Sequence, residues 1–169
     1  MKESLQDLFF LEDNGQFELA FVAYNSRYSC NKNDCEICKH FYFFLWTAIE
    51  NAPDSFQESI NLRHLLQVLL AEGKQNFSDV ADFNFIAGYT VSIFPHEYGD
   101  YEDLESQAKA MLLTASQLEP ANLIYKLVYL GSIPDSNPQV YRQARIDAAP
   151  EILEKFGGNG VLNKYFIGV

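Results

Sequence analysis

The sequence predicts an all-α protein, and three observations indicate this class. No segment shows the sustained alternation of apolar and polar residues that marks a half-buried strand. Short groups of glycine, proline, asparagine and aspartate separate the apolar stretches. Within those stretches apolar residues recur at helical spacing, most clearly Leu62, Leu65, Leu66, Leu69 and Leu70. We therefore expect a compact bundle of about eight helices in antiparallel hairpins, partly solenoid-like.

The central element is expected within residues 28–51, where a cysteine-rich turn leads into the most apolar part of the chain. Every residue from Phe41 to Trp46 is apolar, so a helix here is apolar around nearly its whole circumference. Such a helix belongs in the middle of a core. A buried strand also fits a short aromatic run, but the length of the segment favours the helix.

Two shorter helices are expected before this element. Leu5, Leu8 and Phe9 fall on one side of an amphipathic helix that Asp13-Asn14-Gly15 ends. A second helix is expected over residues 17–26.

After the central element, Ser55 and Glu58 have the form of a capping box that opens the leucine-rich helix, with Gly73 at its end. Ser78 is expected to cap the next helix, which runs towards Pro95. Gly88 lies inside that helix and costs ~1 kcal/mol relative to alanine.

The length and composition predict one helical domain over residues 1–169, large enough to bury a core. The chain has 23 acidic and 12 basic residues, a net charge of −11. This charge repels nucleic-acid phosphates and anionic lipid head groups, so we expect no direct nucleic-acid or membrane binding and instead a basic protein partner. No apolar stretch reaches signal-peptide or membrane-spanning length, and the odd, clustered cysteines do not fit a secreted disulfide framework, so a cytoplasmic location is expected.

The cysteines suggest a metal site. Cys30, Cys35 and Cys38 have the spacing C-x4-C-x2-C, and three thiolates with one imidazole can form a tetrahedral zinc site. His40 is a candidate fourth ligand, but in a helix that begins near Cys38 it points to nearly the opposite side. Zinc is therefore an optional structural cofactor; the alternative is that the cysteines are buried packing residues and reduced thiols.

An acidic segment is the candidate partner-binding site. It comprises Glu97, Tyr98, Asp100, Tyr101, Glu102, Asp103 and Glu105. Tyrosine supplies contact area in interfaces, and carboxylates steer and pair with arginine or lysine. The structural alternative is a solvated helix start, where acidic side chains interact favourably with the helix dipole.

Nothing in the sequence indicates an enzyme. It contains no nucleophile elbow, no phosphate-binding glycine loop and no HExxH motif. The glycines of residues 157–160 follow no strand and are better explained as a helix end before a last short helix. Arg142 and Arg145 lie on one helical face, where local acids can pair with them.

The string GDYEDLESQAKAMLLTASQLEPAN resembles the second helix of a tetratricopeptide repeat and the turn that follows it. In that family a glycine and an aromatic residue open the helix, small residues pack within the hairpin, and a proline and a small polar residue start the next repeat. The resemblance implies helical hairpins over about residues 99–157, without a regular array, because no period of about 34 residues runs through the chain. The matching positions are Gly99, Tyr101, Ala108, Pro120 and Asn122, with the Leu130-Gly131 pair beyond them.

The chain as a whole resembles the helical immunity proteins of bacterial contact-dependent growth inhibition systems. The residues that suggest this are FYFFLW after the cysteines, the acidic YGDYEDLE and the later EKFGGNGVLNKYF. The resemblance implies tight binding of one cognate basic toxin domain, a nuclease, whose active site is covered by carboxylates that imitate phosphate. Two alternatives remain: a solenoid-type adaptor that binds a peptide in a concave groove, and a zinc-dependent enzyme with an open coordination position.

Overall fold

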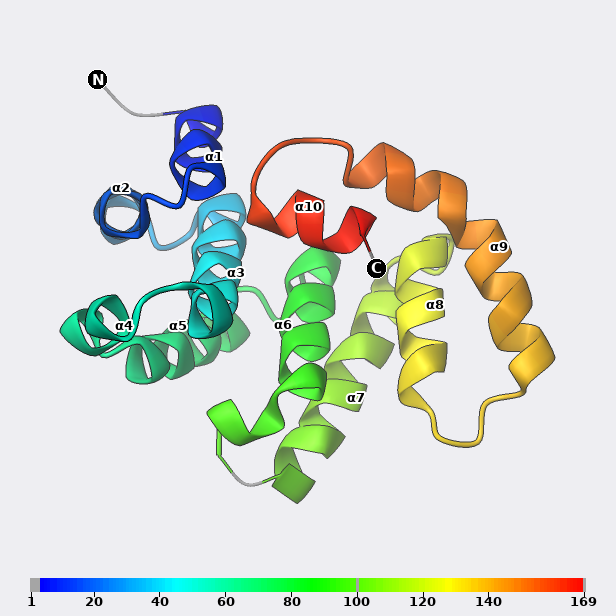
Figure 1. Cartoon of the computed structure of the whole chain (residues 1–169). Coiled ribbons are helices and arrows are strands. Elements are labelled where there is room, and N and C mark those ends of the chain that lie inside the picture. The colour runs from blue at the N-terminus through cyan, green and yellow to red at the C-terminus, as the bar shows by residue number, and fades with distance from the viewer. Residues whose placement is uncertain (1–3, 100, 169) are drawn as a thin grey trace. The chain divides into compact units, whose positions relative to one another are not determined.

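The computed structural model describes residues 4–99 and 101–168, and of residue 101 only the backbone. Its regular elements in these ranges are all helical, which confirms the all-α class (Figure 1). Within the described residues there are ten α-helices rather than the expected eight, and one short 3-10 helix. In order they are α1 (Leu5–Asp13), α2 (Phe17–Cys30), α3 (Cys35–Asn51), α4 (Asp54–Ile60), α5 (Leu62–Asn76), α6 (Ala81–Ile93), η1 (Pro95–Glu97), α7 (Tyr101–Leu118), α8 (Leu123–Ser132), α9 (Pro138–Lys155) and α10 (Val161–Ile167).

The helices form two compact units. The first unit combines Met1–Asn76 with Lys155–Val169, and the second unit is Phe77–Glu154. The first unit is therefore discontinuous in the sequence. Each unit has its own packed interior.

The core of the first unit is built around α3, as its composition predicts. All residues from Ile37 to Trp46 are buried. The phenol ring of Tyr24 on α2 stacks on Phe41 at 5.5 Å between ring centres, with the planes 6° apart. Offset stacking of this kind adds about 0.5–1.5 kcal/mol to the gain from area burial. The aromatic run thus supplies the core side chains of the unit.

Helix α10 completes the same core from a distant part of the sequence. Phe166 lies 5.6 Å from Phe43 and 4.9 Å from Phe156 between ring centres. Tyr165 meets the edge of Trp46 at 5.4 Å. The last short helix that the sequence predicts is confirmed.

In the second unit, α6 and α7 pack closely because of a glycine. A Cβ atom on Gly88 would lie 2.9 Å from Cγ of Leu112 and 3.0 Å from the carbonyl oxygen of Ala108. The glycine that weakens the helix in isolation thus allows two helices to approach. Helix α8 joins them through buried Tyr125, whose hydroxyl donates to Asp82 at 3.0 Å.

Several expected helix boundaries are wrong. The leucine-rich helix is two helices, because Asn61 adopts a left-handed conformation with φ 50° and ψ 59° between α4 and α5. Ser55 is inside α4 and Gly73 is inside α5, so neither is a cap. Ser78 does not cap α6, whose N-cap is Val80.

The cysteine-rich turn is shorter than expected. Helix α2 continues to Cys30, and α3 starts at Cys35, where the side chain of Asp34 accepts from the backbone N–H of Ile37. Only residues 31–34 connect the two helices. Two of the three cysteines are therefore helical residues of α3.

Candidate functional site

The acidic segment lies in the second unit, at the connection from η1 to α7. Glu97 at the end of η1 is buried, with 8% of its surface exposed. One of its carboxylate oxygens lies 3.3 Å from Nε2 of His96. Tyr98 is half-buried. Both side chains therefore pack against other residues of their own unit and present little surface to a partner.

The first two turns of α7 carry the exposed acids. Glu102 and Asp103 are exposed, and Glu105 is partly exposed, with an oxygen 3.6 Å from Nζ of Lys109. Glu102 and Glu105 are one turn apart on the helix, so their side chains are neighbours. The structure thus brings together Glu102, Asp103 and Glu105. Asp100 and the side chain of residue 101 lie outside the described residues.

Acidic charge is unevenly divided between the two units. The second unit holds 12 of the 23 acidic residues and only 4 of the 12 basic ones, a net charge of −8 out of −11. The acidic start of α7 therefore belongs to the more negative part of the chain. A field of this sign attracts basic partners from a distance and weakens with added salt.

The three cysteines differ in environment. Cys30 is exposed, Cys35 is intermediate, and Cys38 is buried. Burial raises the pKa of the Cys38 thiol from 9.0 to about 12, with a further contribution from nearby Cys35. Within the described residues, no group of three or more His, Cys, Asp or Glu side chains is placed to hold a metal ion.

His40 faces other groups than the thiols. Its ring packs against Phe9 with 4.8 Å between ring centres, and its Nε2 lies 3.7 Å from a carboxylate oxygen of Glu36. The neighbouring imidazole of His40, together with the hydrogen bond from Lys39, lowers the pKa of Glu36 to about 2. The residues present do not fit a zinc site in this arrangement, and zinc stays a prediction that metal analysis tests.

A polar network holds the cysteine-bearing end of the first unit. The hydroxyl of Tyr28 donates to one oxygen of Glu72 on α5, and Nζ of Lys32 pairs with the other oxygen at 2.9 Å. The hydrogen bond from Tyr28 lowers the pKa of Glu72, and the bond from Lys32 adds to this effect. This network joins α2 to α5 beside Cys38, so its role is structural.

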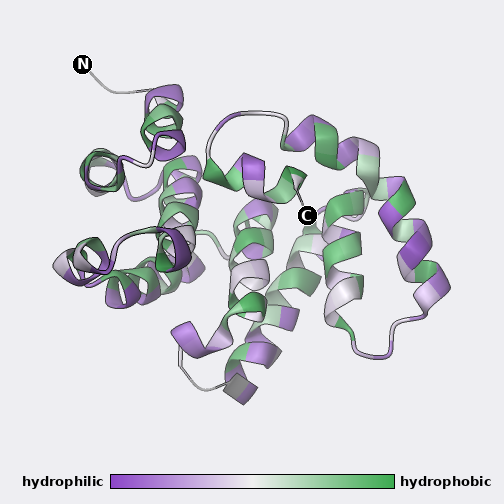
Figure 2. Ribbon diagram, in the orientation of Figure 1, coloured by the Kyte–Doolittle hydropathy of each residue, from purple (hydrophilic) through white to green (hydrophobic). Residues whose placement is uncertain are grey.

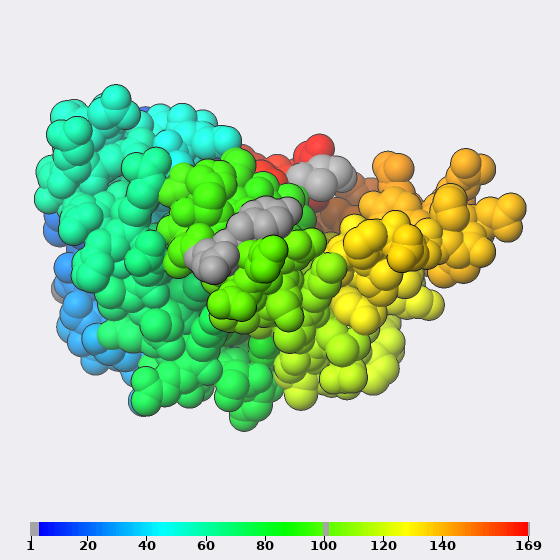
Figure 3. All heavy atoms as spheres, turned by 90° about the horizontal axis from the view of Figure 1, so that it is seen from below, coloured from blue at the N-terminus to red at the C-terminus, as the bar shows by residue number. Residues whose placement is uncertain are grey.

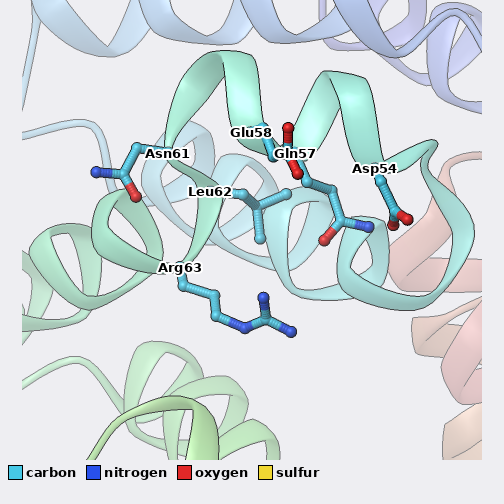
Figure 4. Close-up of a pocket in the computed structure, with 6 residues that line it drawn as sticks. All are labelled: Asp54, Gln57, Glu58, Asn61, Leu62 and Arg63. Carbon is cyan, nitrogen blue, oxygen red and sulfur yellow. The ribbon is translucent and has the colours of Figure 1, made fainter.

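A hollow of about 470 Å³ lies at the bend between α4 and α5 (Figure 4). Five of its six lining residues are polar or charged, whereas small-molecule pockets are lined mainly by apolar and aromatic side chains. Gln57 in its wall donates to the carbonyl oxygens of Ile49 and Ala52 at 3.1 and 3.0 Å, so it holds the end of α3. The lining residues are Asp54, Gln57, Glu58, Asn61, Leu62 and Arg63.

The sequence reading missed one buried carboxylate. Glu12 on α1 is 7% exposed, and its two oxygens accept from the Tyr24 hydroxyl at 2.6 Å and from the backbone N–H of Val161 at 3.0 Å. Neighbouring Asp13 pairs with Lys164 at 2.9 Å. Its position in the sequence could have indicated this burial, because Glu12 follows Leu8 by four residues and so lies on the apolar face of α1.

Comparisons with known proteins do not identify a family or a function for this site. No protein-family model matches the chain, and searches of curated proteins and of solved structures found no match either. In the part of the chain that the structure describes, each helix is too short or too polar to cross a membrane. The functional conclusion therefore depends on charge, exposure and packing.

Proposed function

We propose that this protein is an immunity protein, which binds and neutralises a cognate basic toxin domain, a nuclease, in the cytoplasm. The observation that carries the proposal is the exposed acidic start of α7, within a unit of net charge −8. A nuclease binds phosphate through basic groups, and carboxylates on a folded surface can occupy the same groups.

The geometry narrows the contact surface that the sequence suggests. Glu102, Asp103 and Glu105 form the proposed contact, which we call the α7 acidic face. Glu97 is buried beside His96, so we assign it to the packing of η1. The acids at the start of α7 also interact favourably with the helix dipole, so the same residues stabilise the helix and present negative charge.

The test compares two triple variants with the same change in net charge. One variant carries Glu102→Lys, Asp103→Lys and Glu105→Lys on the α7 acidic face. The control carries Asp79→Lys, Glu119→Lys and Asp135→Lys, three exposed acids elsewhere in the second unit. Partners are sought by co-expression with candidate toxin domains, and the kinetics of each complex are measured at several salt concentrations.

We expect the α7 variant to lose affinity and the control to retain most of it. Each buried charge pair lost costs ~2–5 kcal/mol of binding free energy, whereas rim pairs mainly lower the association rate. Equal effects of both variants would show that only net charge matters. If no toxin domain binds the wild-type protein or is neutralised by it, the immunity proposal is wrong.

The adaptor alternative rests on the resemblance of α7 to a tetratricopeptide helix. It requires a peptide groove in the second unit, whereas the hollow at Leu62 lies in the first unit. An enzyme that uses zinc at the cysteines requires a set of ligands close together, and within the described residues no group of three or more His, Cys, Asp or Glu side chains is placed to hold a metal ion. We therefore prefer a binding function without catalysis.

A further inference from the structure

Helix α9 has apolar side chains on both sides but is covered on one. Ala144 and Ala148 are buried, and the side chain of Glu151 accepts from the backbone N–H of Leu123 at 3.1 Å, which ties this face to α8. On the rest of the helix Ile146 is 61% exposed and Leu153 is 64% exposed. Figure 2 shows apolar and polar residues mixed along this helix. Exposed apolar side chains that line up along one side of a helix can mark a contact surface.

The exposed residues form an ordered stripe. Arg142, Ile146, Ala149 and Leu153 are all exposed and are separated by four, three and four residues. This is the spacing of the seam in a two-stranded coiled coil, in which each side chain inserts between residues of the facing helix. We call these four residues the α9 stripe. In Figure 3 the orange atoms of this helix stand at the surface of the face in view.

Charges along α9 decide what can cover the stripe. Exposed Arg142 and Arg145 lie in its first half; exposed Asp147 and Glu154 lie in its second half, followed by exposed Lys155 at its end. Within the described residues, neither arginine forms an ion pair or a hydrogen bond, contrary to the pairing with local acids that the sequence suggests. A parallel helix with the same sequence would place arginine beside arginine. An antiparallel copy places the arginines of each helix beside the acids of the other.

We propose that the α9 stripe is a dimerisation surface, on which a second copy of this chain packs its own α9 in antiparallel orientation. Such an interface is isologous, so every contact occurs twice. In this register Ile146 packs against Ala149 of the second copy, and the aliphatic stem of Arg142 covers Leu153 of the second copy. The guanidinium group then reaches Glu154 beside it. A basic toxin domain fits this stripe poorly because of the two arginines, so the proposal is independent of the α7 acidic face.

The first test is the mass of the protein in solution. Because the seam is short, we expect a dissociation constant on the order of micromolar. Sedimentation equilibrium should show a mass that rises with concentration from that of the 19.3 kDa chain towards twice that value. Ile146→Asp should abolish the rise. Val22→Asp is the matched control, because Val22 is similarly exposed, at 63%, but lies on α2; it should dimerise like the wild type.

The second test uses charge and does not depend on the exact register. Arg142→Glu with Arg145→Glu leaves Lys155 as the one exposed basic residue among the described residues of α9, and Asp147→Lys with Glu154→Lys gives a helix whose exposed charges are all basic. Each variant alone should be monomeric because like charges face each other in its homodimer. An equimolar mixture should form a heterodimer. Glutamate and lysine are both good helix formers, and lysine in the last turn is favourable with the dipole, so the helical signal should persist.

Three results would overturn the proposal: a wild-type protein that stays monomeric at the highest concentration, an Ile146→Asp variant that still dimerises, or a mixture of the two charge variants that stays monomeric. A wild-type protein that dimerises but binds no toxin domain would contradict only the proposed immunity function. A wild-type protein that binds a toxin domain but stays monomeric would contradict only the proposed dimerisation through the α9 stripe.

Discussion

Glu12 is the buried acid whose protonation should alter stability near neutral pH. Burial raises its pKa from 4.5 to about 7, although the hydrogen bonds from Tyr24 and Val161 act in the opposite direction. A carboxyl group whose pKa is raised by folding contributes stability below pH 4.5, and this contribution is lost as the pH rises through about 7. A shift of this size corresponds to about 3 kcal/mol at most.

We therefore expect the wild-type protein to lose more unfolding free energy between pH 5 and pH 8 than Glu12→Gln, which stays neutral. Urea unfolding at several pH values gives the unfolding free energy of both proteins. The contributions of the other titrating groups cancel in the difference between the two values at each pH. Parallel pH profiles would show that Glu12 is not the group responsible.

The thiols should react in the order of their exposure. With an aromatic disulfide reagent, Cys30 should react first, Cys35 more slowly, and Cys38 only as fast as the protein opens, because it is buried with a raised pKa. Cysteine-to-serine variants assign each phase. Equal protection of all three thiols, together with one zinc per chain by metal analysis, would instead support the predicted zinc site.

At the scale of helices, packing explains both the successes and the errors of the sequence reading. The aromatic run predicts α3 because composition alone shows that such a helix must be buried. The break at Asn61 escapes prediction because leucine spacing continues across it, and asparagine is one of the few residues that tolerate the left-handed region without signalling a stop. The burial of Glu97 beside His96 escapes prediction for a similar reason, since burial depends on neighbours that sequence spacing does not reveal.

Two helix glycines should respond in opposite ways to alanine. Gly88→Ala gains ~1 kcal/mol of helix propensity, but its Cβ atom must displace Leu112 or the backbone of Ala108. Overpacking costs about 1–3 kcal/mol, so we expect a net loss of about 1 kcal/mol. Gly131→Ala meets only the ring of Tyr141 at 3.3 Å, which can move, and should be neutral or stabilising. Thermal unfolding of both variants checks this; equal effects would contradict close packing at Gly88.

At the scale of the whole molecule, the first unit depends on α10. Phe166→Ala should cost about 3–5 kcal/mol, because the ring is buried against Phe43 and Phe156. The matched control is Ile167→Ala, since Ile167 is 40% exposed on the same helix and should change stability by less than about 1 kcal/mol.

Trp46 reports the same dependence directly, because it is the one tryptophan of the sequence and meets Tyr165. A chain that stops at Glu154 should show red-shifted tryptophan emission, as water reaches the indole ring. Unchanged emission would mean that α10 is not needed to cover this part of the core.

The discontinuity of the first unit also sets the order in which the protein can mature on the ribosome. Phe43 and Trp46 emerge early, but the segment that covers them follows the entire second unit. At about 5–20 residues per second, the aromatic face of α3 waits about 6 to 25 seconds for its last helix. The second unit, which is continuous, can fold during that interval. Nascent chains should therefore expose an aromatic surface that chaperones bind until translation reaches Phe166.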